Sequence, residues 1–399
     1  MKSISAHLIK GAVFNPSYAH NSMEFWRDYD KSVIERELVY AAKLGFNSLR
    51  IFLNCTVYAS GKQRFLDNLK HFMLEAHKNG LKVMPVVFDS CFTEIVPDVS
   101  LNIDTWIPSP GVMNMGEHYW EEGEEYSLSL INLLKDDPAL LMWDIMNEPL
   151  CTEYFYKYEG ELREKHKAEI YGFLKHFCAF FKAHDSINPI TVGHDSYIRN
   201  EETGDWVDIL SCHDYSPSVR GIDEAADKAV EQGKRLGKQI FNSETGCPGR
   251  SNPYDRVIES MNRHKLGYFL WEVMIGVGFW SNRHGLIYPD GTIRDPAAVA
   301  ALSGFFRNRA ARTALVPDIE GYASDIAGRI QKWLASPEKD IDEGLLIADM
   351  AANICEGCLL LPESELPSAE INRLASACDI EAALNKWLPT INATLKPKV

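Results

Sequence analysis

The sequence predicts an α/β fold, namely a (β/α)8 TIM barrel with a C-terminal helical extension. Short apolar runs alternate with amphipathic helical stretches from residue 8 to residue 309, and eight such runs can be counted. Near-continuous apolar strands that alternate with helices are typical of a parallel sheet covered on both faces, and eight units suit a closed barrel. The competing arrangement is an open doubly wound sheet, which usually has a glycine-rich turn after its first strand, and the sequence has no such turn there.

The eight expected strands follow one another along the chain at residues 8–14, 47–53, 81–88, 140–147, 190–194, 208–215, 239–244 and 266–272. The helices expected between them lie at residues 62–79, 162–184, 222–236, 252–264 and 295–309. In the first of these helices, apolar residues recur at helical spacing on one face, and Gly80 follows it where a C-cap glycine belongs. We therefore expect the barrel to occupy residues 1–316.

The pattern changes at Pro317, and residues 317–399 contain no expected strand. Helices are expected there near residues 318–336, 341–354, 367–377 and 379–388. This segment is apolar enough to pack on the barrel or to form a small helical domain of its own, and both arrangements remain open. We find no catalytic pattern in it.

Composition excludes several classes of protein. A hydrophobic fraction of 46% and a charged fraction of 24% are typical of a globular protein and exclude a disordered or fibrous chain. The formal net charge of −15 would repel phosphate backbones, so we expect no nucleic-acid partner. No apolar run approaches the ~20 residues of a membrane span, so we expect no membrane partner. The first seven residues contain no apolar signal core and the nine cysteines are scattered, so we expect free thiols and a cytoplasmic location.

Polar residues end several of the expected strands, which is where barrels of this kind carry their chemistry. Glu148 and Glu244 end the fourth and seventh strands, so they would face each other across the barrel mouth. Two opposed carboxylates are what the hydrolysis of an acetal requires, one as a proton donor and one as a nucleophile. On position alone, both could equally be salt-bridge partners at strand ends.

The local sequences favour the catalytic interpretation. Residues 143–149 (WDIMNEP) closely resemble the strand-four motif of the retaining glycoside hydrolases of clan A, especially the cellulase-like family 5. Residues 241–246 (FNSETG) resemble the strand-seven motif of the same clan. The resemblance covers roughly residues 8–309 and implies that Glu148 is the acid/base, that Glu244 is the nucleophile and that Asn147 binds the sugar 2-hydroxyl.

Other matches extend the resemblance to further strands. His213 and Tyr215 resemble the clan's His-x-Tyr on strand six, which implies that the tyrosine orients the nucleophile. Arg50 resembles the strand-two arginine beside the nucleophile, where a guanidinium would hold a carboxylate ionised. Trp271 resembles the strand-eight tryptophan on which the apolar face of a sugar stacks.

The third strand departs from the family pattern. The cellulase-like family commonly has a histidine near the end of this strand, and here residues 88–91 read FDSC. We expect Asp89 to take over a contact to a sugar hydroxyl. The long segment 89–122 that follows is expected to form a lid or wall of the site, or to pack its aromatic residues on the barrel rim. Trp280, which follows the eighth strand, is expected to line the substrate site.

The sequence therefore predicts a retaining β-glycoside hydrolase that cleaves β-linked oligosaccharides or glycosides by double displacement. Because a cytoplasmic enzyme meets short imported oligosaccharides, we expect exo-action on short substrates. A carbohydrate is the expected partner, with no cofactor and no metal, and no pattern indicates an oligomeric state. Two alternatives remain open: a metal-dependent sugar isomerase that uses Glu148, Glu244, His213 and Asp214 as ligands, and a non-catalytic carbohydrate-binding barrel.

Overall fold

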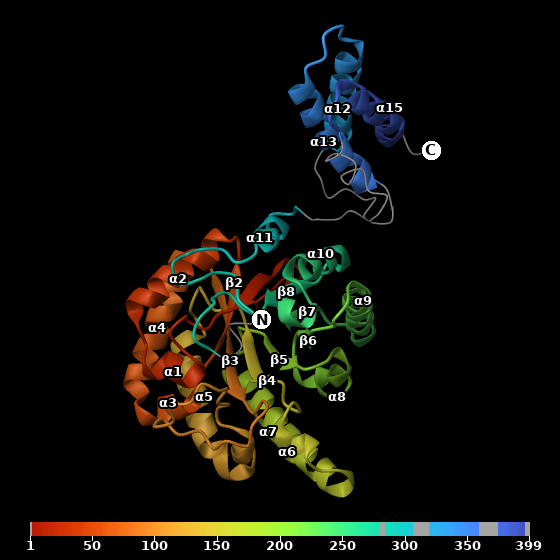
Figure 1. The fold of residues 1–399 in the computed structure, drawn as a ribbon. Helices are drawn as coiled ribbons and strands as arrows, with labels where there is room; N and C mark the ends of the chain where they lie inside the picture. Colours follow the sequence, from red (N-terminus) through yellow and green to blue (C-terminus); the bar gives the residue numbers. More distant parts are fainter. Residues whose placement is uncertain (1, 279–283, 306–318, 359–373, 396–399) are drawn as a thin grey trace. The chain divides into compact units, whose positions relative to one another are not determined.

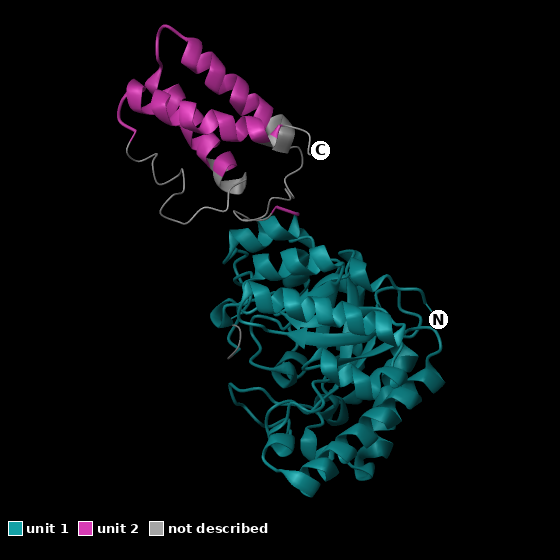
Figure 2. Cartoon of the chain, turned by 90° about the vertical axis from the view of Figure 1, so that its right-hand side faces the viewer, with its two compact units in different colours: residues 1–303 teal, residues 304–399 magenta. Residues whose placement is uncertain are grey.

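The computed structural model describes residues 2–278, 284–305, 319–358 and 374–395. The chain divides into two compact units, Met1–Ser303 and Gly304–Val399 (Figure 2). The boundary expected from the sequence, between residues 316 and 317, falls in the segment 306–318, which lies outside the described residues.

The first unit is a closed barrel of eight parallel strands that are hydrogen-bonded in chain order (Figure 1). The strands are β1 (Lys10–Val13), β2 (Ser48–Phe52), β3 (Lys82–Asp89), β4 (Trp143–Asn147), β5 (Ile190–His194), β6 (Leu210–Asp214), β7 (Ile240–Thr245) and β8 (Gly267–Leu270). Each of them overlaps one of the eight strands expected from the sequence. The predicted (β/α)8 barrel is therefore confirmed.

Helices surround the strands (Figure 1). They are α1 (Ser22–Arg27), α2 (Lys31–Lys43), α3 (Cys55–Ser60), α4 (Lys62–Lys78), α5 (Trp120–Leu134), α6 (Glu153–Tyr156), α7 (Gly160–His184), α8 (Asn200–Thr203), α9 (Val219–Leu236), α10 (Tyr254–His264) and α11 (Pro296–Leu302). Helices α4, α7, α9 and α10 match four of the five expected barrel helices within a few residues. The fifth, α11, ends seven residues before the expected residue 309, at Leu302.

Amphipathic sequence and end residues explain these helices. In α4, the residues Phe65, Leu69 and Phe72 recur every three or four positions and are fully buried, and each such burial stabilises the fold by roughly 1.5–3 kcal/mol. Gly80 follows this helix with a φ of 72°, a left-handed conformation that glycine adopts without a steric penalty. The helix therefore ends where the sequence predicts, and the chain turns back into β3.

The barrel interior is filled by two separate layers of side chains. The lower layer, near the amino ends of the strands, includes Met84, Met142, Phe241 and Phe269. The upper layer consists of Val13, Phe52, Val86 and Trp271, with Trp106 and Tyr215 packed against it. Because the lower end is closed by apolar side chains, the polar residues at the carboxyl ends of the strands are left to form a site at the mouth.

The second unit is helical, as the sequence predicts for the C-terminal extension (Figure 2). Its described residues form α12 (Ile319–Ala335), α13 (Ile341–Cys358) and α15 (Ala377–Thr394), which share an apolar core that includes Trp333, Trp387 and Ile347. Of the helix expected at 367–377, residues 367–373 lie outside the described residues, and 374–376 precede α15. Among the described helices of both units, none has the length and apolar character that a bilayer span requires.

Candidate active site

The carboxyl ends of the strands bring eight of the nine predicted site residues to the barrel mouth. They are Arg50 on β2, Asp89 at the end of β3, Asn147 at the end of β4, Glu148 directly after it, His213 on β6, Tyr215 directly after β6, Glu244 on β7, and Trp271 directly after β8. The ninth, Trp280, lies outside the described residues.

The two glutamates predicted to react lie close to each other. A carboxylate oxygen of Glu148, a carboxylate oxygen of Glu244 and a ring nitrogen of His213 all lie within 4.8 Å of one another. Each glutamate keeps 8% of its surface exposed, so both are desolvated but open to the cavity described below. Two carboxylates this close repel each other unless nearby donors and cations compensate.

Glu244 receives hydrogen bonds at both oxygens. The Nη1 group of Arg50 donates to Oε2 at 2.8 Å, and the hydroxyl of Tyr215 donates to Oε1 at 2.9 Å. A hydrogen bond from a charged donor is about twice as strong as one between neutral groups. Because Arg50 is fully buried and cannot lose its proton, its charge stabilises the ionised form of Glu244.

Two residues of β4 bind Arg50, and a glycine of β5 leaves space for its guanidinium. Its Nε donates to Asp144 at 2.9 Å, and its Nη2 donates to Asn147 at 2.8 Å. On β5, Gly193 faces the guanidinium, and a Cβ atom at this position would lie 2.7 Å from Nη2. Glycine inside a strand often marks such a close approach, and here it lets the arginine extend across the barrel.

Glu148 is held in an unusual backbone conformation. Its φ is 39°, in the left-handed region that a residue with a side chain rarely adopts and that costs on the order of 1–3 kcal/mol. Its amide donates to the carbonyl of Gly193 at 2.6 Å, and its carbonyl accepts from the amide of Cys151 at 2.9 Å. These bonds hold the turn that follows β4 and direct the carboxylate towards the barrel mouth.

His213 and Cys91 are among the side chains that contact the Glu148 carboxylate. Nδ1 of His213 donates to Oε1 at 2.6 Å, and the Cys91 thiol donates to Oε2 at 3.0 Å. The same ring nitrogen of His213 is 3.6 Å from Glu244. His213 therefore lies between the two glutamates but much nearer to Glu148.

The pKa values of these groups follow from burial and from this asymmetry. Burial by itself raises the pKa of Glu148, but the hydrogen bond and charge of His213 outweigh it and lower this pKa to about 2. Burial by itself lowers the pKa of His213, but the two glutamates outweigh it and raise this pKa. Burial raises the pKa of Glu244, and the Glu148 charge adds to this, against the opposing effects of His213, Arg50 and Tyr215. In the free protein, the proton of the Glu148–His213 bond therefore rests on the histidine.

Asp89 is turned towards the protein. Its Oδ2 accepts from the indole of Trp106 at 2.6 Å, and its Oδ1 accepts from Asn147 at 3.2 Å and from the amide of Cys91 at 3.0 Å. Burial raises the pKa of Asp89 to about 7 despite these three donors. The structure thus places Asp89 where it orients Trp106 and Asn147, and the described residues that line the cavity do not include it.

Aromatic rings form one side of the mouth. Trp271 lies 5.9 Å from Phe52 and 5.9 Å from Trp106, measured between ring centroids, and Trp106 lies 4.9 Å from Phe52 in an edge-to-face arrangement. Trp106 belongs to the long segment after β3, which the sequence predicts to form a wall of the site or to pack on the rim. It does both, since its indole packs on Phe52 and also lines the cavity.

The cavity at the mouth has a volume of about 250 Å³. It is lined by Cys91, Phe92, Trp106, Asn147, Glu148, Cys151, Asp195, Tyr215, Glu244, Arg250, Trp271 and His284. Carboxylates, an arginine and aromatic rings thus surround one small space. This is a suitable environment for a polar ring-shaped ligand that has apolar faces.

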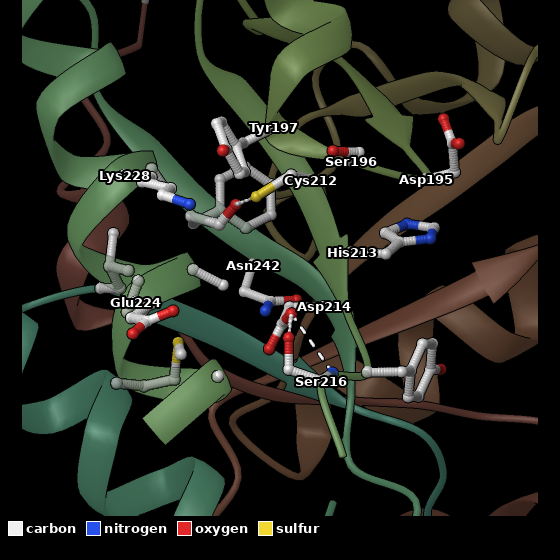
Figure 3. A pocket seen from close by; sticks show the side chains of 18 residues that line it. Asp195, Ser196, Tyr197, Cys212, His213, Asp214, Ser216, Glu224, Lys228 and Asn242 are labelled. Atoms are coloured by element: carbon white, nitrogen blue, oxygen red, sulfur yellow. Dashed lines mark hydrogen bonds between the residues drawn. The ribbon is translucent and has the colours of Figure 1, made fainter. Parts of the chain in front are cut away.

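A second cavity, of about 410 Å³, lies between β6 and α9 (Figure 3). In Figure 3, Glu224 and Lys228 of α9 lie on one side of it, and His213 and Asp195 lie on the other. Asp195 and Tyr215 line both cavities. The second cavity therefore adjoins the site from behind β6.

Among the described residues, three clusters bring possible metal ligands within 4.8 Å of one another. They are Glu148, His213 and Glu244; Cys91, Glu148 and Cys151; and Glu35, His71 and Glu75. In the first cluster, the guanidinium of Arg50 already supplies a cation 2.8 Å from Glu244. The third cluster consists of exposed and half-exposed residues of α2 and α4.

Sequence reasoning missed several residues of this site. Asp144 and Gly193 carried a local signal, because an acid inside an apolar strand and a glycine inside a strand both need a reason to be there. Cys91 carried none, since it contacts Glu148 only because the segments that follow β3 and β4 meet, whereas Cys151 lies in the same turn as Glu148. His194, which ends β5, bonds to Thr203 at 2.7 Å and supports the loop that follows.

Comparison with known proteins adds a family match. A family model described as Cellulase (glycosyl hydrolase family 5) matches residues 17–276 of the chain. This range includes all strands from β2 to β8 and all eight of the placed site residues. A search of curated proteins gave no match.

Several solved structures share the fold. An exo-β-1,4-mannosidase, Op5Man5, from Opitutaceae bacterium strain TAV5 is 14% identical over 89% of this chain and 70% of that chain, with a TM-score of 0.59. An endo-β-1,4-mannanase from Thermotoga petrophila is 15% identical over 74% of this chain and 75% of its own, with a TM-score of 0.52. A GH5_18 protein from Streptomyces cattleya, solved with GlcNAc, is 13% identical over 75% of this chain and 83% of its own, with a TM-score of 0.51. At these identities the likeness establishes the barrel fold alone.

Proposed function

The chain belongs to the cellulase family, glycosyl hydrolase family 5, and from this membership we propose that it is a retaining β-glycosidase that acts on the ends of short β-linked oligosaccharides. The observation that carries the proposal is the pair formed by Glu148 and Glu244, whose oxygens lie within 4.8 Å of each other at the barrel mouth. Retaining enzymes hold their two carboxyl groups roughly 5–5.5 Å apart, whereas inverting enzymes leave roughly 6.5–9.5 Å for a water molecule.

In the first step, a carboxylate oxygen of Glu244 attacks the anomeric carbon while the bond to the leaving oxygen breaks. Glu148 gives that oxygen its proton, and a covalent glycosyl-enzyme forms. Arg50 and Tyr215 hold Glu244 in position for this attack through the bonds at 2.8 and 2.9 Å. Asn147, which Arg50 and Asp89 hold in place, is available to the sugar 2-hydroxyl.

In the second step, Glu148 removes a proton from a water molecule, and this water attacks the anomeric carbon from the side that the leaving group vacated. The bond to Glu244 breaks, and the sugar leaves with its original configuration. The same carboxylate thus acts first as an acid and then as a base, which requires a pKa that changes as the charge on Glu244 changes.

The histidine accounts for how Glu148 becomes an acid although its pKa is low in the free protein. Because the proton between the two rests on His213, it needs to cross only the 2.6 Å hydrogen bond to reach Glu148. This transfer removes both the His213 charge, which lowers the pKa of Glu244, and the Glu148 charge, which raises it, so Arg50 and Tyr215 are left to hold the nucleophile ionised. The glutamates and the histidine therefore titrate as one coupled set rather than as separate groups.

The size of the cavity supports exo-action. Its 250 Å³ lie below the ~300–1,000 Å³ of pockets that take drug-sized ligands, so it suits one sugar ring rather than a length of polymer. Phe92 and Trp106, from the segment after β3, form part of its wall. Product analysis on a defined series of oligosaccharides tests this point, because internal cleavage at early times would contradict it.

The reaction itself is tested with aryl β-glycosides in which the sugar is varied among mannose, glucose, xylose and glucuronic acid. We expect at least one to be hydrolysed with retention of configuration, as followed by NMR at early times. Glu148→Gln and Glu244→Gln should each abolish turnover of the natural linkage. Glu37→Gln is the matched control, since Glu37 is also a buried glutamate but lies on α2. Wild-type turnover in either site variant, or inversion of configuration, would refute the proposal.

The metal-dependent sugar isomerase is the alternative that the same test addresses. Of its four expected ligands, Glu148, His213 and Glu244 do lie together, whereas the cluster among the described residues does not include Asp214. The Arg50 cation beside Glu244 disfavours a metal ion there, because an arginine cannot lose its proton and two permanent cations would share one carboxylate. Glycosidase activity that survives a chelator excludes this alternative, and activity that requires an added divalent ion would favour it.

We also propose a cytoplasmic location. The cysteines whose side chains the structure describes, which leave out Cys358, are free thiols, and this fits a reducing compartment. Cell fractionation tests this placement, and recovery of the chain in a secreted fraction would contradict it.

A further inference from the structure

Three residues at the barrel mouth form a cluster of which the proposed reaction uses only Glu148. Cys91, Glu148 and Cys151, which we call the dithiol site, bring two thiols and a carboxylate within 4.8 Å of one another. Cys91 lies in the segment after β3 where the family commonly has a histidine. The dithiol site is therefore a departure from the family pattern in this chain.

The backbone brings the two cysteines together. The amide of Phe92 donates to the carbonyl of Cys151 at 2.7 Å, and the amide of Glu153 donates to the carbonyl of Phe92 at 2.7 Å. These bonds form a parallel bridge between Phe92 and Thr152, so the residues just before them, Cys91 and Cys151, lie in register as neighbours. The two thiols therefore lie close because the strand ends are paired.

The carboxylate of Glu148, the third member of the dithiol site, is also held in place. The turn after β4 includes the bond from the Cys151 amide to the Glu148 carbonyl, and His213 holds one carboxylate oxygen of Glu148 at 2.6 Å. The other oxygen, Oε2, faces the Cys91 thiol at 3.0 Å. All three side chains line the 250 Å³ cavity, so an ion can reach them and keep a water molecule as a fourth ligand.

We propose that the dithiol site binds a thiophilic divalent cation, with Zn²⁺ as the first candidate, through the sulfur atoms of Cys91 and Cys151 and Oε2 of Glu148. Two thiolates and a carboxylate suit Zn²⁺, whereas Mg²⁺ and Ca²⁺ prefer oxygen ligands only. The two thiol protons pass to solvent as the ion binds, and no electron is transferred. The bound ion occupies the carboxylate that must move a proton, so it switches off the proposed glycosidase; this last consequence rests on the proposed function.

Direct binding is the first test and needs no enzyme activity. The full chain, reduced with a phosphine, is dialysed against Zn²⁺ or Mg²⁺, and the bound metal is measured. We expect saturable binding of Zn²⁺ and none of Mg²⁺. Cys151→Ser should weaken Zn²⁺ binding by more than the ~10–100-fold that loss of an outer-shell contact costs. Cys378→Ser, which changes an exposed cysteine of α15, is the matched control and should bind as the wild type does.

Two further measurements identify the metal ligands and test whether the bound metal inhibits the enzyme. Co²⁺ in place of Zn²⁺ should give a sulfur-to-cobalt charge-transfer band that Cys91→Ser and Cys151→Ser each weaken. Zn²⁺ should inhibit hydrolysis of the aryl glycoside, and a chelator should restore it. Equal Zn²⁺ binding in wild type and Cys151→Ser, or no binding at all, would overturn the proposal. Binding without any glycosidase activity would leave the dithiol site standing and would refute the proposed function instead.

Discussion

Replacing Gly193 by alanine tests whether the position of Arg50 controls the site. The added Cβ atom would lie 2.7 Å from Nη2 of Arg50, and 3.0 Å from both Asp144 and His213. To reach ordinary contact at 3.4 Å, Nη2 must move by about 0.7 Å. A displacement of this size away from Asn147 would stretch their 2.8 Å bond to about 3.5 Å, where it is lost as a hydrogen bond.

The magnitudes follow from this displacement. Overpacking of a buried site costs about 1–3 kcal/mol, so the free energy of unfolding should fall by that amount. A misplacement approaching 1 Å in a catalytic site costs up to ~10²-fold, so kcat/KM on the aryl glycoside should fall by about 10–100-fold. Gly172→Ala is the control, since a Cβ atom there meets nothing within 4 Å in the middle of α7 and should stabilise the protein by about 0.5–1 kcal/mol.

Urea unfolding and steady-state kinetics on both variants decide the matter. If Gly193→Ala keeps the stability and the kcat/KM of the wild type, Arg50 has room that the structure does not indicate, and the reasoning fails. If stability falls while kcat/KM stays unchanged, the packing is as described but the position of Arg50 does not control the reaction.

Three more changes probe separate parts of the molecule. Tyr215→Phe removes a hydroxyl that donates to Glu244 at 2.9 Å and lowers the pKa of this glutamate. The value of kcat/KM should therefore fall by at least about tenfold, and the acidic limb of its pH profile should move to higher pH. An unmoved limb would contradict this. Burial raises the pKa of Asp89 to about 7, so the folded protein keeps a proton that the unfolded chain loses near pH 4, and stability falls as the pH rises between these values by up to ~1.4 kcal/mol per pH unit. Asp89→Asn should flatten this slope in urea unfolding at pH 5 and pH 7, and an equal slope in both proteins would count against it. Gly344→Ala would place a Cβ atom 2.7 Å from the ring of Trp333, so the helical unit should lose about 1–3 kcal/mol without a change in kcat/KM, as thermal unfolding would reveal.

The barrel could be predicted because its evidence is local. Each strand is a short apolar run bounded by polar residues, and α4 and α7 repeat apolar residues on one face. Helices α1, α2 and α5 were not singled out, although Asp30 caps α2 by accepting bonds from the amides of Ser32 and Val33. The family match over residues 17–276 agrees with the resemblance that residues 143–149 and 241–246 suggest.

The site was only partly accessible to sequence reasoning. Residue order along the chain predicts that Glu148 and Glu244 end different strands of one barrel and meet at its mouth. It does not predict that Asp89 bonds to Trp106 and is absent from the cavity lining, because that depends on how the segment after β3 folds back. The distance from His213 to each glutamate depends likewise on side-chain packing between strands.

The closed barrel, the helical extension and the two carboxylates at the strand ends follow from local sequence, since apolar periodicity and short motifs are properties of neighbouring residues. Which groups share the protons and which thiols face Glu148 depends on how distant segments pack. Most of those contacts join residues from different strands, which are far apart in the sequence and meet only when the whole barrel packs together.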